Sequence, residues 1–306
     1  MGQRLATSRG RLSVAARSRR PGNWMRAVAP FRRRLLVAAA SWPALSRAQD
    51  SPALTLGVVP NVSPRLLVAT YQPLRQWLEA RLAQPVQVLT APDFASFHQR
   101  CAQGQYPGYI TTPNLGALAQ ADADARVLGV FEPGIAALAV APRGRVDQAL
   151  TDLRGRKLAL ANPASLVALR GLAWLQGLGL QAGRDFGVVR APNEDSLARW
   201  LDAGDAPLAL MSGGEFSQLS EPRRQWLGVV QQVAMLPGFF AMCPAQQSAD
   251  EAARWQQALA GFLADPVSQG FRQATGLRSL RPLSRADQTE LAPFIDATRH
   301  ALATAS

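Results

Sequence analysis

The sequence has little of the chemistry on which most enzyme sites depend. Its 306 residues include two cysteines, Cys101 and Cys243, and two histidines, His98 and His300. Zinc sites and redox pairs need several such residues at short spacings, and those spacings are absent. The HExxH, GxSxG and phosphate-loop patterns are absent as well. We therefore predict a protein that is not an enzyme and that holds no metal and no cofactor.

Two cysteines are too few for a disulfide framework. Cys101 falls late in one predicted helix, and Cys243 follows a predicted strand much further along the chain. An oxidising compartment would allow the two thiols to pair, and two separate buried thiols fit the sequence equally well. The sequence leaves both alternatives open.

The first 48 residues lack acidic side chains entirely. They contain 11 arginines, whereas the rest of the chain has 22 Arg and Lys residues against 21 Asp and Glu residues. The formal net charge of +12 therefore divides into +11 for residues 1–48 and +1 for the remainder. Because nucleic-acid binding needs a concentrated positive charge, a nearly neutral body argues against that function.

Residues 32–48 have the three parts of a secretory signal peptide. Arg32-Arg33-Arg34 form a basic segment, Leu35 to Leu45 form an apolar core, and Ser46-Arg47-Ala48 provide a small-residue cleavage site before Gln49. We expect export to the periplasm by the general secretory route, and the paired arginines are also compatible with twin-arginine export. No later run reaches the length of a membrane span, so we expect no stable membrane insertion after cleavage.

Two methionines, Met1 and Met25, are candidates for the start of translation. A signal peptide of usual length would begin near Met25, so the residues before it are not needed for export. The sequence leaves Met1 and Met25 open as the true start.

After the leader, short apolar runs alternate with helical patterns. Leu54–Val59, Val86–Leu89 and Tyr106–Ile110 have the length and composition of strands, and a helical pattern follows each one. Leu158–Ala161 and Leu208–Met211 repeat this rhythm in the middle third of the chain. The alternation is typical of an α/β fold in which mostly parallel sheets are flanked by helices.

The stretch from Thr151 to Gly171 places polar groups where a strand gives way to a helix. Asn162 and Ser165 stand between the apolar strand that ends at Ala161 and a helical pattern of leucines. Unpaired backbone N–H groups and the helix dipole make such a position a natural anion site. Ordinary helix capping by Asn162 or Ser165 explains the same residues.

Three stretches of the sequence resemble one family of binding proteins. DLRGRKLALANPASL is similar to the segment that opens the second lobe of phosphonate-type periplasmic binding proteins, and LTLGVVPNVSPRLL resembles that family's first strand and ligand loop. The stretch from PLRQW to NLGALA resembles the helix, strand, helix and loop that follow. The resemblance covers most of residues 54–276 and depends on the order and spacing of weak motifs.

The resemblance implies a two-lobed type 2 periplasmic-binding-protein fold with two crossover strands as the hinge. We expect the crossings near residues 137–143 and 229–235. The expected organisation is a leader at 1–48, the first part of lobe 1 at 49–140, lobe 2 at 141–232, and at 233–306 the return to lobe 1 with the C-terminal helices.

In such a fold the loops that follow the strands of both lobes face one ligand cleft. Neutral hydrogen-bonding side chains recur in these loops, and such groups together with helix N-termini can hold a small anion. The candidate ligand-binding residues are Asn61, Ser63, Thr111, Thr112, Asn114, Asn162, Ser165, Asn193 and Ser212.

The sequence also departs from the family. The Ser-Thr-Ser run at the family's second-lobe helix start is replaced by Ala164-Ser165-Leu166-Val167, and the aromatic of the first ligand loop is missing around Val62-Ser63. A phosphonate specificity therefore does not carry over. A different ligand and a cleft that has lost tight anion binding both fit these changes.

We predict an exported, monomeric solute-binding protein that closes its two lobes on a small anionic ligand, phosphonate- or phosphate-like, and delivers it to an ABC importer. The alternative is a periplasmic ligand-sensing partner of a membrane sensor kinase, which the sequence does not separate from transport. An enzyme on the same scaffold has the least support, because the sequence offers no nucleophile and base.

Overall fold

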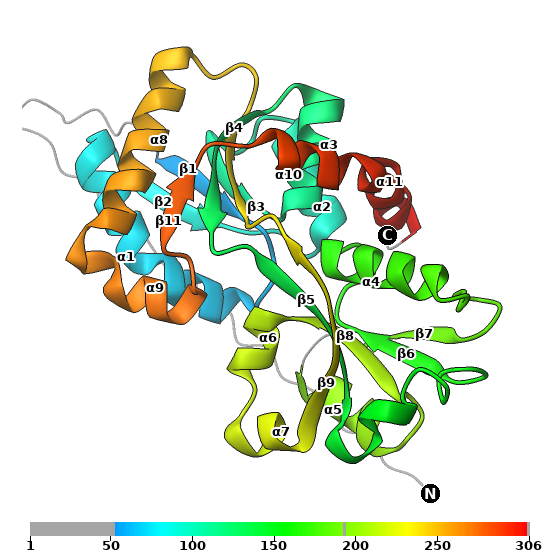
Figure 1. The fold of residues 1–306 in the computed structure, drawn as a ribbon. Coiled ribbons are helices and arrows are strands. Elements are labelled where there is room, and N and C mark those ends of the chain that lie inside the picture. Colours follow the sequence, from blue (N-terminus) through cyan, green and yellow to red (C-terminus); the bar gives the residue numbers. More distant parts are fainter. Residues whose placement is uncertain (1–52, 192–193, 305–306) are drawn as a thin grey trace, which may run out of the picture. The chain divides into compact units, whose positions relative to one another are not determined.

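The structure is a computed structural model that describes residues 53–191 and 194–304 (Figure 1). The predicted leader at 1–48, both candidate start sites and Asn193 lie outside the described residues. The described chain contains two β-sheets, and helices pack against both. We call the elements around the first sheet lobe 1 and those around the second sheet lobe 2.

The first sheet has the strand order β11-β4-β10-β3-β1-β2. Its strands are β1 (Leu54–Val58), β2 (Val86–Leu89), β3 (Gly108–Thr111), β4 (Arg126–Glu132), β10 (Phe240–Cys243) and β11 (Ser279–Arg281). β1 pairs in parallel with β2 and β3, whereas β10 runs antiparallel to both of its neighbours. β1 to β4 therefore point one way, and β10 and β11 point the other.

Two hydrophobic clusters cover the faces of the first sheet, because successive strand residues point to opposite sides. On β3, Ile110 belongs to one cluster and Tyr109 to the other. The first cluster is closed by α1 (Pro64–Leu82), α8 (Ala249–Ala264) and α9 (Gln269–Thr275). The second is closed by α2 (Phe94–Ala102), α3 (Pro113–Ala123), α10 (Arg285–Leu291) and α11 (Ile295–Thr304).

The second sheet has the strand order β7-β6-β8-β5-β9. Its strands are β5 (Ile135–Pro142), β6 (Lys157–Leu160), β7 (Gly187–Arg190), β8 (Leu208–Ser212) and β9 (Leu227–Leu236). Only β5 runs against the others. One face packs on α4 (Leu166–Gly177), and the other on α5 (Glu194–Asp202), α6 (Gly213–Gln218) and α7 (Glu221–Trp226).

The chain crosses between the sheets twice, from β4 to β5 and from β9 to β10. The crossings lie a few residues from the positions expected from the sequence, because β5 and β9 pair along nearly their whole length inside the second sheet. Both crossings need glycine. A Cβ atom at Gly134 would lie 2.4 Å from the carbonyl oxygen of Leu236, and one at Gly238 would lie 1.9 Å from that of Phe131.

The two cysteines are free and buried, and they lie in different clusters. Cys101 belongs to the α2–α3 side of the first sheet and Cys243 to the α1–α8 side. Burial raises the pKa of both thiols above the usual value. Of the two alternatives that the sequence left open, the structure has the separate buried thiols.

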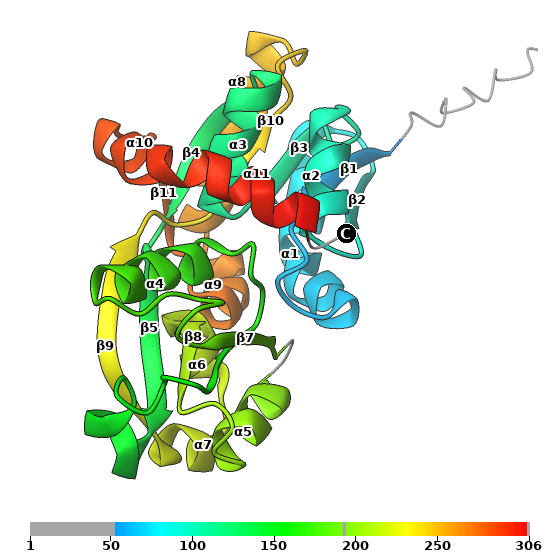
Figure 2. The same ribbon diagram turned by 90° about the vertical axis from the view of Figure 1, so that its right-hand side faces the viewer.

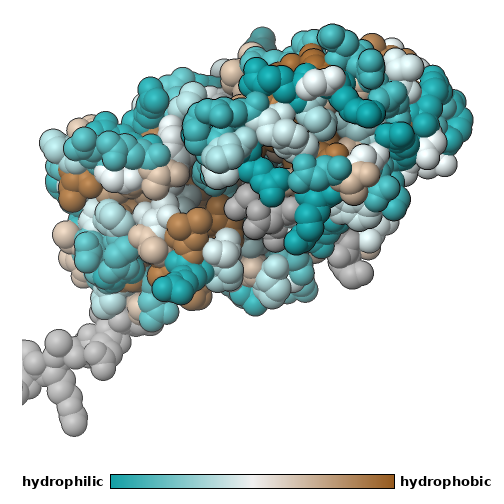
Figure 3. Space-filling model, turned by 90° about the horizontal axis from the view of Figure 1, so that it is seen from below, coloured by the Kyte–Doolittle hydropathy of each residue, from teal (hydrophilic) through white to brown (hydrophobic). Residues whose placement is uncertain are grey.

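Exposed apolar side chains are spread over several elements. Figure 3 shows one face of the molecule, on which hydrophilic residues predominate and hydrophobic ones form small patches. Scattered exposure of this kind is usual and does not by itself mark an interface. The large exposed apolar residues are Leu66, Val68, Leu89, Leu178, Val188, Val229, Met235 and Val267.

Candidate functional site

The N-terminal ends of α3 and α4 meet between the two lobes. Asn114, in the first turn of α3, donates from Nδ2 to the carbonyl oxygen of Ala164 at 2.9 Å. Ala164 lies between Asn162 and Ser165 at the start of α4, and Thr112 is the N-cap of α3. The structure therefore brings together four of the residues predicted from the sequence, two from each lobe.

The start of α3 carries polar atoms without partners. Thr112 makes no side-chain cap hydrogen bond, and its Oγ1 is buried with no hydrogen-bond partner among the described residues. The Oδ1 atom of Asn114 is in the same situation, and Asn114 is only 1% exposed. Buried polar groups are nearly always satisfied, so each such atom requires an explanation.

The start of α4 is capped in the ordinary way. Asn162 accepts a hydrogen bond from the backbone N–H of Ala164 at 2.9 Å, and the Ser165 hydroxyl accepts one from that of Ala168 at 3.1 Å. The capping interpretation of this segment is confirmed. Because capping uses the side-chain oxygen as acceptor, the amide N–H groups of Asn162 and the hydroxyl proton of Ser165 stay free to act as donors.

A cavity of about 130 Å³ opens between the start of α2 in lobe 1 and the segment that leads into α4 in lobe 2. Arg190, at the end of β7, contributes an exposed guanidinium that has no ion-pair partner among the described residues. Asp93, the N-cap of α2, accepts a hydrogen bond from the backbone N–H of Ser96 at 2.7 Å. The lining residues are Asp93, Phe94, Ala95, Asn162, Pro163, Ala164, Arg190 and Leu302.

Sequence reasoning missed Arg190 and Asp93 as cleft residues. Arg190 ends a strand and Asp93 caps a helix, and these positions are recognisable in the sequence. We expected neutral hydrogen-bonding side chains at such positions and therefore did not predict charged ones. Leu302 had no local signal, because a distant helix brings it to the cavity.

Asn162 is the predicted site residue in the cavity lining. Thr112, Asn114 and Ser165 stand at the helix starts but do not line the cavity, and neither do Asn61, Ser63, Thr111 and Ser212. Asn61 and Ser63 are exposed in the β1–α1 loop, and Thr111 is buried within β3, opposite Phe240 of β10. Ser212 forms a capping box with Glu215 at the start of α6. Asn193 lies outside the described residues.

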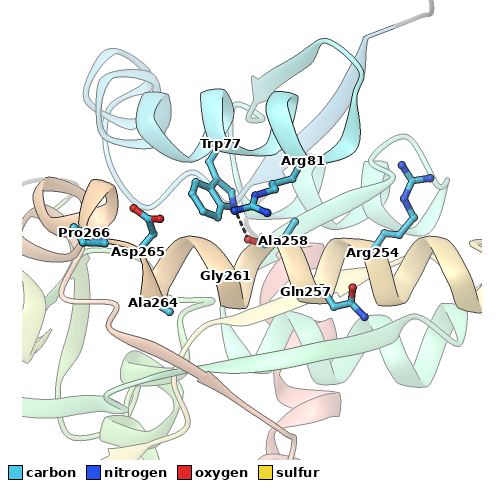
Figure 4. Close-up of a pocket in the computed structure, with 9 residues that line it drawn as sticks. All are labelled: Trp77, Arg81, Arg254, Gln257, Ala258, Gly261, Ala264, Asp265 and Pro266. Carbon is cyan, nitrogen blue, oxygen red and sulfur yellow. Dashed lines mark hydrogen bonds between the residues drawn. The ribbon is translucent and has the colours of Figure 1, made fainter.

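A larger groove of about 490 Å³ runs between α1 and α8, and none of the predicted site residues lines it (Figure 4). Four of its polar side chains are already engaged, and two of these contacts join α1 to α8. Trp77 Nε1 donates to the carbonyl oxygen of Ala258 at 2.8 Å, and the Arg81 guanidinium stacks over the Trp77 ring. Arg254 donates to the carbonyl oxygen of Leu82, and Asp265 caps Val267. We therefore assign this groove a structural role.

Within residues 53–191 and 194–304, no group of three or more His, Cys, Asp or Glu side chains is placed to hold a metal ion. No helix in the same part of the chain is long and apolar enough to cross a bilayer.

Comparison with solved structures shows the fold. XAC2383 from Xanthomonas citri, bound to chloride ion, aligns with a TM-score of 0.69 at 17% identity, over 81% of this chain and 98% of that protein. PhnD1 from Prochlorococcus marinus, in complex with methylphosphonate, aligns with a TM-score of 0.69 at 9% identity, over 81% and 98%. SsuA from Xanthomonas axonopodis pv. citri, an alkanesulfonate-binding protein bound to MOPS, aligns with a TM-score of 0.57 at 17% identity, over 82% and 95%.

These similarities confirm the two-lobed periplasmic-binding-protein fold expected from the sequence. No curated protein matches the sequence significantly. A family described as ABC transporter, phosphonate, periplasmic substrate-binding protein matches residues 56–288. The chain therefore belongs to the family of periplasmic substrate-binding proteins of phosphonate ABC transporters.

Proposed function

We propose that this protein captures a small oxyanion in the cleft between its lobes and delivers it to an ABC permease. The observation that carries the proposal is the meeting of two helix N-termini, those of α3 and α4, near the exposed guanidinium of Arg190, which has no ion-pair partner in the part of the chain that the structure describes. Helix N-termini offer unpaired N–H groups and the positive end of the helix dipole, so both attract an anion. Membership of a transporter family favours import over the sensor-kinase alternative.

In the proposed site, Arg190 supplies the charge and the neutral side chains supply orientation. The guanidinium can bind two oxygens of one anion at once, because its N–H groups form a planar fork. Asn162 and Ser165 retain donors that can reach the same anion, and the Thr112 hydroxyl, which has no partner among the described residues, can donate from the start of the facing helix. The unpaired atom of Asn114 is Oδ1, an acceptor, which suits a donor group on the ligand and not the anion itself. The carboxylate of Asp93 repels negative charge on the part of the ligand next to it, so it favours a ligand with a hydrogen-bond donor at that end.

Several predicted ligand residues do not line the cavity and form a separate proposal. Asn61 and Ser63 follow β1, and Thr111 and Ser212 are the last residues of β3 and β8. We propose that these four residues contact ligands larger than the present cavity holds. We also propose that the protein acts as a monomer, does not bind nucleic acid, and is exported by the general secretory route.

We propose lobe boundaries at the two crossings. Lobe 1 then comprises 49–133 and 238–306, and lobe 2 comprises 134–237, because β5 and β9 belong to the second sheet. These boundaries differ by five to seven residues from the sequence expectation of 140/141 and 232/233. The hinge lies where Gly134 and Gly238 let the two crossing strands approach closely.

Isothermal titration calorimetry tests the proposal. The panel is methylphosphonate, phosphate, an alkanesulfonate and chloride, which are the chemistries held by the similar structures together with the parent oxyanion. We expect at least one oxyanion to bind, and Arg190→Gln to weaken its affinity by about tenfold or more, because a hydrogen bond to a charged group is lost.

The matched control is Arg145→Gln, which removes another exposed arginine of lobe 2 that does not line the cavity. It should leave the affinity unchanged. Equal effects of the two substitutions, or no binding of any anion in the panel, would contradict the proposed site.

A further inference from the structure

The side chain of Asn114 is held by two other segments of the chain. Its Nδ2 donates to the carbonyl oxygen of Ala164 in lobe 2 at 2.9 Å and to Oγ1 of Thr298 in α11 at 3.1 Å. Thr298 is fully buried, and its own hydroxyl proton goes to the carbonyl oxygen of Phe294 at 2.7 Å. The hydroxyl therefore acts as an acceptor toward Asn114, which fixes the orientation of the Asn114 amide.

The same C-terminal helices reach across to lobe 2. Leu302 of α11 lines the cleft cavity together with Asn162 and Arg190 of lobe 2. The Oε1 atom of Glu290 in α10 lies 3.3 Å from Nε of Arg170 in α4, and the two side chains form an ion pair. Figures 1 and 2 both place α11 beside the N-terminal half of lobe 2's α4, and the two helices are in contact.

α11 is also fastened firmly to lobe 1. Arg299 donates to Asp122, in the last turns of α3, at 2.7 Å, and α11 packs along α3 and α2. Because α11 moves with lobe 1, its contacts with α4 and its hold on Asn114 act across the cleft.

We propose that α11 stabilises the closed state through its contacts across the cleft, and we call this arrangement the clasp. Thr298 is its positioning residue, because it orients the side chain of Asn114. The proposal rests on the proposed function, since closing on a ligand is what the clasp serves. Thr298 keeps the Asn114 amide pointing at lobe 2, so the Asn114–Ala164 hydrogen bond forms whenever the lobes close. Leu302 closes the end of the cavity at the same time.

Loss of the Thr298 hydroxyl destabilises the closed state more than the open state. In the closed state the Asn114 N–H group is buried, so removing its acceptor leaves a donor unsatisfied. In the open state the Ala164 contact is absent, and water can reach the amide of Asn114 and replace the lost acceptor. Thr298→Val, which keeps the shape of the side chain, therefore shifts the equilibrium toward the open state.

Double electron–electron resonance on the full-length exported protein measures this shift without any ligand. Spin labels at Gln99→Cys in α2 and Gln176→Cys in α4 report the distance between the lobes, and both positions are exposed. The native thiols are buried, and burial raises the pKa of each, so the introduced cysteines take the label.

We expect a closed population in the parent protein and a rise of about fivefold in the ratio of open to closed molecules in Thr298→Val, as the loss of one net hydrogen bond predicts. Thr298→Ser, which restores the acceptor, should return the ratio to the parent value. Thr289→Val is the matched control, because Thr289 makes the same hydrogen bond to the carbonyl oxygen four residues earlier but is exposed on α10.

An unchanged distance distribution in a folded Thr298→Val protein would overturn the clasp, and so would a parent protein that is wholly open. A shift of the same size in Thr289→Val would overturn it as well. Circular dichroism at the same temperature confirms that each variant is folded. Since no ligand is present, these outcomes are separate from the calorimetry, and the clasp can fail while the anion site stands.

Discussion

At the residue scale, the polar side chains of the cleft divide into those whose oxygen caps a helix and those with unpaired atoms. Asn162, Ser165 and Asp93 accept hydrogen bonds from backbone N–H groups and fix where α4 and α2 begin. Thr112 and Asn114 each keep a buried polar atom that has no partner within residues 53–191 and 194–304. A single sequence could not separate the two kinds, because Asn, Ser and Thr suit both roles.

The crossing glycines give a residue-scale prediction about stability. Gly238→Ala should lower the free energy of unfolding by about 1–3 kcal/mol, because the added Cβ would overlap the carbonyl oxygen of Phe131. Urea denaturation measures this change. Gly144→Ala is the control, since nothing lies within 4 Å of a Cβ atom there. Equal stability of the two variants would show that the crossing backbone moves to accommodate a side chain.

His98 gives a prediction about pH. Burial lowers the pKa of His98 below its usual 6.5, against the attraction of Asp122, and Arg299 lowers it further. The unfolded chain therefore binds this proton more readily than the folded protein does. Stability is full above pH 6.5 and falls as the pH drops below that value.

Urea unfolding at about pH 7.5 and about pH 5.5 measures this loss. His98→Gln should remove most of the difference between the two pH values. Asp185 and Asp287 do not titrate in this window, because arginine hydrogen bonds hold the pKa of each carboxyl at about 2. A pH dependence that persists unchanged in His98→Gln would assign the effect to another group.

At the element scale, the order of strands and helices followed from the apolar runs. The strands expected at Leu54–Val59, Val86–Leu89 and Leu158–Ala161 match β1, β2 and β6 to within one residue. The return to the first sheet was harder to place. The crossing expected near residues 229–235 lies within β9, which stays in the second sheet, and the strand that returns to the first sheet is β10. The mixed exposure of β9 reflects its position at the edge of the second sheet. Periodicity in the sequence does not show to which of the two sheets such a strand belongs.

The groove between α1 and α8 gives an element-scale prediction. Trp77→Phe keeps an aromatic ring under Arg81 but removes the N–H group that binds the carbonyl oxygen of Ala258. We expect the free energy of unfolding to fall by about 1 kcal/mol, and anion affinity in calorimetry to stay at the parent value. A loss of affinity with unchanged stability would make this groove a ligand site.

At the scale of the whole molecule, the candidate site depends on contacts that no local pattern contains. The sequence located the loops that follow the strands, and it placed Asn114 and Asn162 among them. It did not show that Asn114 reaches Ala164, or that Leu302, Arg190 and Asp93 line one cavity. These relations join segments far apart in the chain, and they arise only when two lobes and a C-terminal helix pack together.

The central claim is that an anion binds between the starts of α3 and α4, and hydrogen–deuterium exchange tests it most directly. The measurement compares amide exchange with and without the oxyanion that binds most tightly in the calorimetric panel. The account predicts slower exchange at 112–116 and 162–168, and unchanged exchange in α1 and α8 along their groove. Protection along that groove, with none at the two helix starts, would contradict the account.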